Sequence, residues 1–267
     1  MSGPPQHWYH SIELPDGTVT PGAFDLRPST GIVPLPERLD GKRCLDVGTW
    51  DGFWAFEMER RGAAEVVAID VEDPDRWDWP PRERLRKERG GLAVLAERKP
   101  PGAGFTHAAR ALGSKARRVD RSVYDLDPEV DGRFDLVFVG SLLLHLRDPV
   151  GALARVRAVC AGEAVVADTV EAIPSLLRPR TPTARLEGLE RPWWWLPNRA
   201  GLHRIVESAG FEIVARTGLY FVPTGPGHER PRLRDLPRQA LTAQGREEAI
   251  GALRGIPHAA VRARPLG

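Results

Sequence analysis

A short glycine-containing segment, LDVGTWDGFWAFE at residues 45–57, restricts the fold of this chain more than any other feature. The apolar run RCLDVG (43–48) that leads into it ends at a glycine, which is typical of a strand buried on both faces of a parallel sheet. The residues that follow have the spacing of an amphipathic helix that Gly62 ends, and VVAIDV (66–71) is a second buried strand. The segment therefore predicts the tight turn of a βαβ unit.

The rest of the chain continues this alternation of strands and helices. We expect five further strands at 116–126, 134–141, 163–170, 211–219 and 258–265, with helices beginning near residue 82 and at 103–112, 149–160 and 198–210. This pattern predicts an α/β fold with a doubly wound, mostly parallel, seven-stranded sheet. In such a sheet the ligand lies beyond the carboxyl ends of the strands, near the point where the strand order reverses.

The flanking regions are expected to decorate this core. Residues 1–40 are rich in proline, glycine and aromatic residues without steady periodicity, which indicates an extended lead-in that covers the site. A length of 267 residues suits a single further domain, at 41–267, with insertions at about 172–197 and 222–256.

Composition excludes several classes of protein. No apolar run approaches the roughly 20 residues that a membrane-spanning helix needs. The N-terminal residues lack the basic start and apolar stretch of a secretory signal, so we expect a cytoplasmic protein. Cys44 and Cys160 are the two cysteines, and both lie in apolar runs, which indicates buried thiols rather than a disulfide framework or a metal site.

The turn after the first core strand has the chemistry of a nucleotide site. Gly48 and Gly52 allow close approach of backbone and ligand, and the helix that follows presents free N–H groups. Asp70 ends the next strand, where a carboxylate can accept hydrogen bonds from ribose hydroxyls. Asp46 either contacts the ligand or orders the turn by accepting backbone N–H groups. The G-x-G-x-x-G spacing of a nicotinamide-dinucleotide site is absent, which disfavours an oxidoreductase.

Four segments, LDVGTWDG, AIDV, SVYDL and FDLVFVGSLLLHLRDP, together resemble class I S-adenosylmethionine-dependent methyltransferases over residues 40–220. The D-x-G-x-G-x-G motif of that family is matched except at Trp50. The resemblance implies S-adenosylmethionine as cofactor, with its methionine end by Gly48, Thr49 and Gly52, its ribose on Asp70, its adenine by Val71, Ser122 and Val123, and its sulfonium by Gly140 and Ser141.

A narrower resemblance links HSIELPDG, GSLLLHLRDP and WLPN-x-x-x-L to the tRNA wobble-uridine (5-oxyacetic acid) methyltransferase-like family. The characterised tRNA enzymes use carboxy-S-adenosylmethionine and carry a tyrosine immediately before the histidine of the GSLLLHLRDP loop. Leu144 stands at that position here, which favours ordinary S-adenosylmethionine.

Two histidines are candidate catalytic bases. His145 can titrate near neutral pH, and its alternative role is a ring that hydrogen-bonds the backbone of its loop. His10 could fold over the acceptor, or it could simply pack within the lead-in. The candidate acceptor-binding residues are aromatic, and each could instead belong to the core: Trp8, Tyr9, Trp193 and Trp194.

The sequence thus predicts methyl transfer to a hydroxyl group of a small molecule, with an amine or a carbon as less favoured acceptor atoms. A tRNA acceptor is the closest alternative, because residues 82–121 contain twelve basic and four acidic residues, although such a stretch can also be a solvated helix face. An alternative of another class is a protein that binds S-adenosylmethionine without catalysis, since methyl transfer requires no invariant nucleophile.

Overall fold

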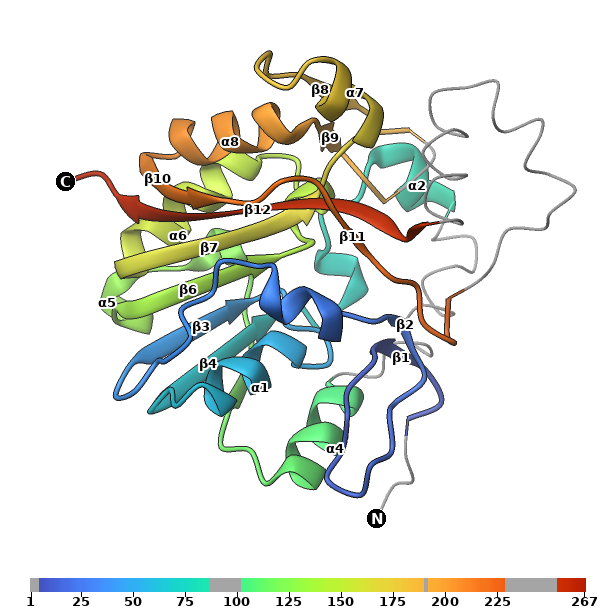
Figure 1. Ribbon diagram of the computed structural model, residues 1–267, viewed down its shortest axis with the longest axis vertical. Coiled ribbons are helices and arrows are strands. Elements are labelled where there is room, and N and C mark those ends of the chain that lie inside the picture. Colours follow the sequence, from blue (N-terminus) through green and yellow to red (C-terminus); the bar gives the residue numbers. More distant parts are fainter. Residues whose placement is uncertain (1–4, 87–101, 190–191, 229–253) are drawn as a thin grey trace, which may run out of the picture.

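An eight-stranded sheet forms the centre of the computed structural model, which describes residues 5–86, 102–189, 192–228 and 254–267 (Figure 1). The strand order is β10-β12-β7-β6-β3-β4-β5, and β11 pairs with β12 beside this path. The strands are β3 (Arg43–Val47), β4 (Glu65–Asp70), β5 (Arg117–Asp120), β6 (Phe134–Gly140), β7 (Cys160–Thr169), β10 (Phe211–Arg216), β11 (Tyr220–Val222) and β12 (Ile256–Pro265). The mostly parallel sheet confirms the predicted fold class, with β11 as an additional short strand.

The strand order reverses at β3. From β3 the chain proceeds to β4 and then β5 on one side, and it later returns to place β6 on the other side. Neighbouring strands from β5 to β7 are parallel, whereas β12 is antiparallel to both β7 and β10. The carboxyl ends of β3 and β6 therefore diverge into a crevice, as expected for a doubly wound sheet.

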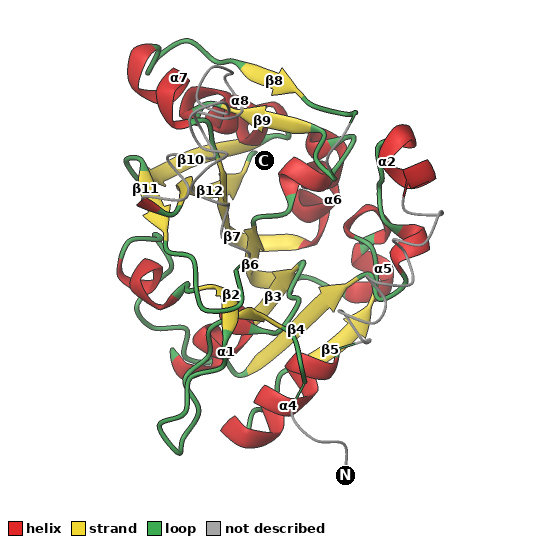
Figure 2. Ribbon diagram, turned by 90° about the vertical axis from the view of Figure 1, so that its right-hand side faces the viewer, coloured by secondary structure: helices red, strands yellow, loops and turns green. Residues whose placement is uncertain are grey.

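Helices cover both faces of the sheet (Figures 1 and 2). α1 (Phe53–Arg60) and α4 (Ala103–Leu112) share one buried apolar cluster, and α6 (Pro149–Val159) and α8 (Arg199–Ser208) share the other. Successive residues of β3 alternate between the two clusters, with Cys44 in the first and Leu45 in the second. This alternation explains why both Cys44 and Leu45 are apolar.

Two predicted strands differ from the observed ones by more than a shift of a few residues at an end. The strand expected at 116–126 ends at Asp120, because the Ser122 side chain accepts a hydrogen bond from Tyr124 N and begins the 3-10 helix η4 (Val123–Asp125). The strand expected at 211–219 is divided between β10 and β11. The predicted cap of α8 is confirmed, since the Asn198 side chain accepts a hydrogen bond from Gly201 N.

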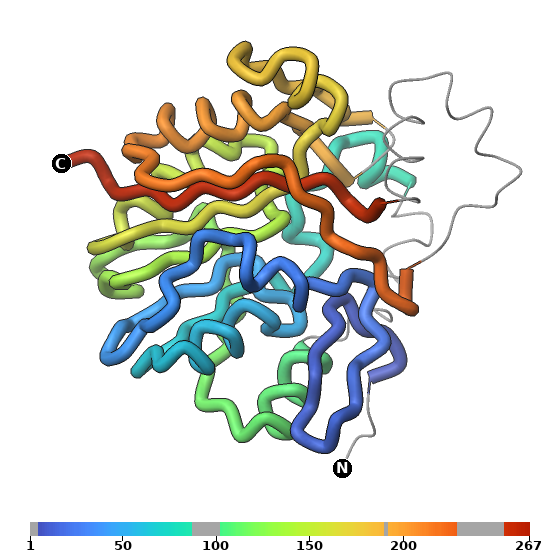
Figure 3. Tube along the Cα trace, in the orientation of Figure 1, coloured from blue at the N-terminus to red at the C-terminus, as the bar shows by residue number. Residues whose placement is uncertain are grey.

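The lead-in packs against the domain. Its short strands β1 (Trp8–His10) and β2 (Gly22–Phe24) pair in parallel, and the 3-10 helix η1 (Arg27–Gly31) follows. Phe24 forms a bridge with Thr224, and Asp25 N donates to Pro223 O at 2.9 Å. Figure 3 shows the blue lead-in beside the orange segment after β11. The lead-in is thus joined to a part of the chain remote in sequence.

The segment expected as an insertion at 172–197 contains α7 (Ala172–Leu177) and an antiparallel pair, β8 (Ala184–Leu186) and β9 (Trp195–Pro197). Most of the insertion expected at 222–256 lies outside the described residues. The remaining short elements are η2 (Pro74–Arg76), α2 (Pro81–Arg86), α5 (Pro128–Asp131) and η5 (Leu143–His145).

Both cysteines are buried and unpaired, as predicted. Among the described helices, none has the length and apolar character needed to cross a membrane.

Candidate active site

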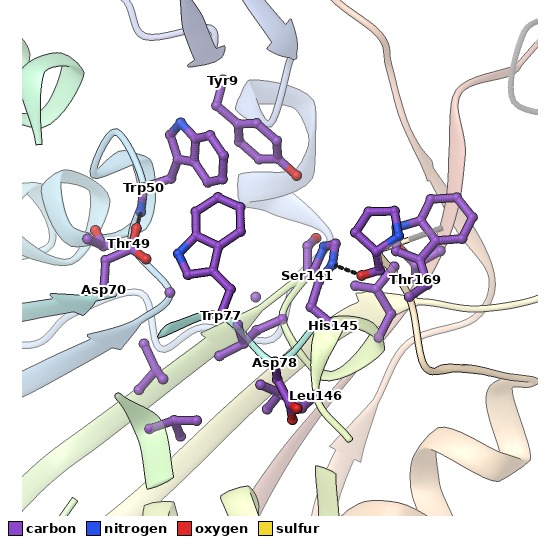
Figure 4. Close-up of a pocket in the computed structure, with 18 of the residues that line it drawn as sticks. Tyr9, Thr49, Trp50, Asp70, Trp77, Asp78, Ser141, His145, Leu146 and Thr169 are labelled. Atoms are coloured by element: carbon purple, nitrogen blue, oxygen red, sulfur yellow. Dashed lines mark hydrogen bonds between the residues drawn. The ribbon is translucent and has the colours of Figure 1, made fainter. Parts of the chain in front are cut away.

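A pocket of about 800 Å³ opens at the carboxyl ends of β3, β4, β6 and β7 (Figure 4). Its floor consists of the residues that directly follow these strands. Its walls come from four segments that are far apart in sequence: the lead-in, the loop at 76–79, the segment at 192–196 and the start of β12. The pocket therefore lies at the switch point that the strand order predicts.

The glycine-containing turn adopts left-handed backbone angles at three residues, Gly48 (φ 77°), Trp50 (φ 46°) and Gly52 (φ 91°). A side chain at Gly48 would meet Leu142, which follows β6. A side chain at Gly52 would clash with the rings of Phe56 and Phe105. Gly52 thus has a packing role and lies outside the pocket lining, whereas Gly48 lines the pocket.

Trp50 is the residue that departs from the glycine motif. Its positive φ shows that the turn retains the backbone form of a glycine at this position, although a large side chain pays a strain cost there. The indole stacks on Tyr9 with 4.6 Å between ring centroids and lies 6.0 Å from the Trp77 ring. Aromatic contacts across three segments offset that strain.

Asp70 lies at the end of β4 and faces the turn. Its carboxylate accepts hydrogen bonds from Trp50 N at 2.9 Å and from Val71 N at 2.8 Å. The Arg118 guanidinium lies 3.7 Å away. Asp70 lines the pocket, as do Val71, Ser122 and Val123. The carboxylate therefore orders the turn while it borders the space where a ligand would bind.

Asp46 is buried beneath the same turn. Its carboxylate accepts a hydrogen bond from Ala55 N at 3.1 Å, so it holds the first turn of α1. Burial raises the pKa of Asp46 to about 7, although the nearby Thr49 hydroxyl and the hydrogen bond from Ala55 N oppose the rise. Asp46 and Thr49 both line the pocket. The ordering role considered for Asp46 is present in the structure.

Asp51 connects the lead-in to the turn. Its buried carboxylate accepts hydrogen bonds from Tyr9 N at 2.6 Å and from His10 N at 3.1 Å. Tyr9 and His10 line the pocket as a result, and the His10 ring lies 6.1 Å from the ring of Phe53. Desolvation, together with the nearby Asp168, raises the pKa of Tyr9 above its usual value.

His145 lies on the opposite wall, in η5. Its Nδ1 is 2.7 Å from the carbonyl oxygen of Pro192. A carbonyl can only accept, so Nδ1 carries the ring proton and Nε2 is the basic nitrogen. Figure 4 shows this ring at the edge of the pocket, with its hydrogen bond to the carbonyl oxygen as a dashed line.

Hydrogen bonds hold the segment at 192–196 in place along one side of the pocket. Trp194 N donates to Leu144 O at 2.7 Å, and the Trp194 indole donates to the backbone carbonyl of Asp78. Asp78 in turn accepts a hydrogen bond from Arg147 N at 2.6 Å. Trp193 lines the pocket, whereas the Trp194 ring lies outside the lining, below Arg147. The tryptophan run thus divides between the pocket and the packing that closes it.

Asp168, on β7, supports the loop that carries His145. Its Oδ2 accepts hydrogen bonds from Leu142 N at 2.9 Å and from Leu143 N at 2.7 Å. Burial raises the pKa of Asp168 to about 6, although these backbone hydrogen bonds oppose the rise. The carboxylate thereby fixes the start of η5.

Residues 27–216 match the family described as "Methyltransferase domain". The chain belongs to this methyltransferase family. It is an S-adenosylmethionine-dependent enzyme whose mostly parallel sheet, glycine turn and crevice are those of a class I methyltransferase.

Solved methyltransferase structures resemble this one in fold. A methyltransferase from Haloferax volcanii, in complex with the Trm112 methyltransferase activator, matches with 12% identity over 90% of this chain and 88% of that chain, at a TM-score of 0.51. The 1,6-didemethyltoxoflavin-N1-methyltransferase of Burkholderia thailandensis, bound to its substrate and S-adenosylhomocysteine, matches with 16% identity over 85% and 72%, at a TM-score of 0.48. No curated protein matches the sequence.

The methyltransferase brings most of the predicted site residues together at one pocket: Tyr9, His10, Asp46, Gly48, Thr49, Asp70, Val71, Ser122, Val123, Gly140, Ser141, His145 and Trp193. Three lie outside its lining, namely Gly52, Trp194 and Trp8. Trp8 packs in the core with its ring 5.7 Å from that of His107. No cluster of His, Cys, Asp or Glu that could hold a metal ion occurs among the described residues.

Four further residues of this methyltransferase were not predicted as site residues: Asp51, Trp77, Asp168 and His258. Asp168 follows an apolar run, the same signal that identified Asp70, whereas Asp51 lies within the glycine turn itself. His258 and Trp77 carry no local signal, because their places depend on strand pairing and on a loop without regular structure.

Proposed function

We propose that this methyltransferase transfers the methyl group of S-adenosylmethionine to a hydroxyl group of a small molecule. The observation that carries the proposal is the hydrogen bond from His145 Nδ1 to Pro192 O beside the pocket. Because the proton lies on Nδ1, Nε2 can take a proton from an acceptor hydroxyl. An imidazole whose Nδ1 is held by a backbone carbonyl suits an oxygen acceptor, which must lose a proton when it is methylated.

The cofactor side of the pocket fits S-adenosylmethionine. Asp70 can accept hydrogen bonds from the ribose hydroxyls, and Gly48, without a side chain, admits the ligand close to the backbone. Val71, Ser122 and Val123 line the part of the pocket beyond Asp70, where the resemblance puts the adenine. The bound cofactor supplies an electrophilic methyl carbon on a sulfonium. The protein then has to hold the acceptor oxygen in line and exclude water.

The enclosure of the pocket supports a small acceptor. Hydrogen bonds from Trp194 to Leu144 and Asp78 fasten one wall, and those from Tyr9 and His10 to Asp51 fasten another. A pocket of about 800 Å³ is within the range of small-molecule sites. Both walls limit access for a macromolecular acceptor.

A tRNA acceptor has less support among the described residues of the basic stretch at 82–121. Arg118 pairs with Asp70 and Glu72, and Arg121 pairs with Asp131. Those side chains contribute to the internal structure rather than to a free phosphate-binding surface. Residues 87–101 of this stretch lie outside the described part of the chain.

The side chain at 144 supports the ordinary cofactor. Leu144 is buried and lines the pocket at the position where the tRNA enzymes that the chain resembles carry tyrosine. A carboxyl group on the transferred carbon would meet an apolar side chain at that point, which costs free energy.

The test is a labelling reaction. The purified protein would be incubated with methyl-labelled S-adenosylmethionine, a mixture of phenols and aliphatic alcohols, and bulk tRNA. We expect label in the small-molecule fraction. Label in tRNA that disappears steeply with added salt would overturn the proposal. Binding of S-adenosylhomocysteine without label in either fraction would favour a non-catalytic binding protein.

A further inference from the structure

Three polar side chains from adjacent strands meet at the edge of the pocket. Ser141 directly follows β6, Thr169 ends β7, and His258 lies near the start of β12, where it pairs with Thr169 in the strand register. All three line the pocket. His258 reaches the site because β12 runs antiparallel to β7, so its beginning lies at the carboxyl end of β7.

The hydrogen bonds of His258 define its tautomer. Nδ1 lies 3.0 Å from the carbonyl oxygen of Ile256, and Nε2 lies 2.9 Å from Ser141 Oγ and 3.4 Å from Thr169 Oγ1. The carbonyl can only accept, so Nδ1 carries the proton and Nε2 accepts from the hydroxyls. Burial lowers the pKa of His258 to about 4, and the ring is therefore neutral near pH 7.

This arrangement fixes the direction of the Ser141 hydroxyl. Its proton points toward His258 Nε2, so the lone pairs on Ser141 Oγ are the part of the group that can face a ligand. Ser141 also has a positive φ of 49°, an uncommon conformation for a residue with a side chain. Its backbone N–H donates to Ala167 O at 2.8 Å, which anchors the residue to β7.

The strand register places Ser141 one strand beyond the glycine turn. Val47 pairs with Ile69 on one side and with Val139 on the other, so Asp70, Gly48 and Gly140 occupy successive strand ends. Strands are spaced by about 4.8 Å, which puts the ends of β4 and β6 about 10 Å apart. The Leu142 side chain also borders Gly48. A cofactor with its ribose on Asp70 therefore extends over Gly48 toward Ser141.

We propose that His258 is a positioning residue that holds Ser141 Oγ as a hydrogen-bond acceptor facing the sulfonium methyl group. The positive sulfonium polarises the C–H bonds of that methyl group, so its hydrogens carry partial positive charge. An oxygen lone pair attracts these hydrogens in a weak C–H···O hydrogen bond. S-adenosylhomocysteine has neither the charge nor the methyl group, so the contact favours the methyl donor over the demethylated product. The inference rests on the cofactor orientation given under the proposed function, and it is independent of the acceptor.

The experiment compares the affinities of S-adenosylmethionine and S-adenosylhomocysteine by calorimetric titration. Ser141→Ala and His258→Phe should each lower affinity for S-adenosylmethionine about three- to tenfold and change affinity for S-adenosylhomocysteine less than about twofold. The double variant should lose no more than either single variant, because the two residues act through one contact. Binding of S-adenosylhomocysteine also shows that each variant is folded.

Two further variants test whether His258 positions Ser141 or only packs in the core. His258→Gln retains an acceptor atom near the place of Nε2 and should recover most of the lost preference for S-adenosylmethionine. His203→Phe changes a histidine on α8 outside the pocket and should behave as the wild type. The proposal is overturned if Ser141→Ala or His258→Phe leaves the ratio of the two affinities unchanged, or if both ligands weaken equally. An altered orientation of the cofactor would instead be revealed by an Asp70→Ala variant with unchanged affinity for both ligands.

Discussion

The two halves of the pocket are built in different ways. The cofactor half follows β3 and β4, and its principal groups, Gly48 and Asp70, lie in one continuous βαβ segment. The acceptor half is assembled from β6, β7 and β12 with the lead-in and the segment at 192–196. Turn geometry and one carboxylate determine the first half, whereas contacts between distant segments determine the second.

This difference predicts that cofactor affinity and methyl transfer depend on different side chains. Side chains of the cofactor half should affect S-adenosylmethionine and S-adenosylhomocysteine alike, because the two molecules share ribose, adenine and amino-acid groups. Side chains of the acceptor half should affect the reaction, or the contrast between the two molecules. Variants in each half therefore test whether the halves are separable.

The largest expected effect is on turnover in the acceptor half. His145→Ala removes the nitrogen proposed to take the acceptor proton, so the rate should fall about 10²- to 10⁴-fold. Turnover would be measured with the acceptor that the labelling reaction identifies. Affinity for S-adenosylhomocysteine, measured by calorimetry, should change little. Full activity across the pH range would exclude His145 as the base, and an equal loss of cofactor affinity would show that the halves are not independent.

The next effect concerns the cofactor half. Asp70→Ala removes a charged acceptor for ribose hydroxyls, so affinity should fall by about 1 to 3 kcal/mol for S-adenosylmethionine and S-adenosylhomocysteine together. Calorimetry of both ligands measures this loss. Asp73→Ala is the matched control, because the exposed Asp73 side chain accepts a hydrogen bond from Asp75 N within η2. A loss confined to one ligand would contradict the division between the halves.

The third expected effect is a pH dependence of stability within the cofactor half. Burial raises the pKa of Asp46 to about 7 in the folded protein, whereas an unfolded chain releases this proton near pH 4. Between these values the folded state binds more protons, so stability falls as pH rises. Asp46→Asn keeps an oxygen for Ala55 N and removes the titration.

As the pH rises through this window, we therefore expect the unfolding free energy of the wild type to fall relative to that of Asp46→Asn. The difference should change by at most about 1.4 kcal/mol per pH unit. Denaturant unfolding at pH 4.5 and pH 7 measures the difference. The titration of Asp168 contributes to both proteins and cancels in the comparison. An equal pH dependence in the two proteins would argue against a raised pKa at Asp46.

The fold was predictable where apolar runs are continuous. The central residues of β3, β4 and β6 are buried on both faces, so these strands are mostly apolar regardless of neighbouring segments. β5 is shorter than predicted because Ser122 caps η4, a local hydrogen bond that the apolar pattern does not reveal. β11 was not anticipated as a separate strand, since the division after β10 depends on pairing with β12.

The cofactor half of the pocket was as predictable from the sequence as the buried apolar strands. The position of Asp70 follows from one strand and one turn, both visible in a few residues of sequence. His258 is separated from Ser141 by most of the second half of the chain, and only the antiparallel pairing of β12 with β7 joins them. A periodic pattern identifies β12 as a strand, but it does not specify the neighbour of that strand.

The place of β12 in the sheet has a consequence for the order in which the pocket is completed during synthesis. Among the described strands it is the last to be synthesised, and it pairs with β7 on one side and β10 on the other. The glycine turn follows β3 and is synthesised long before β12. Ser141 acquires its histidine partner only after β12 has emerged, so the contact proposed to favour the methyl donor is the last part of the pocket to be completed.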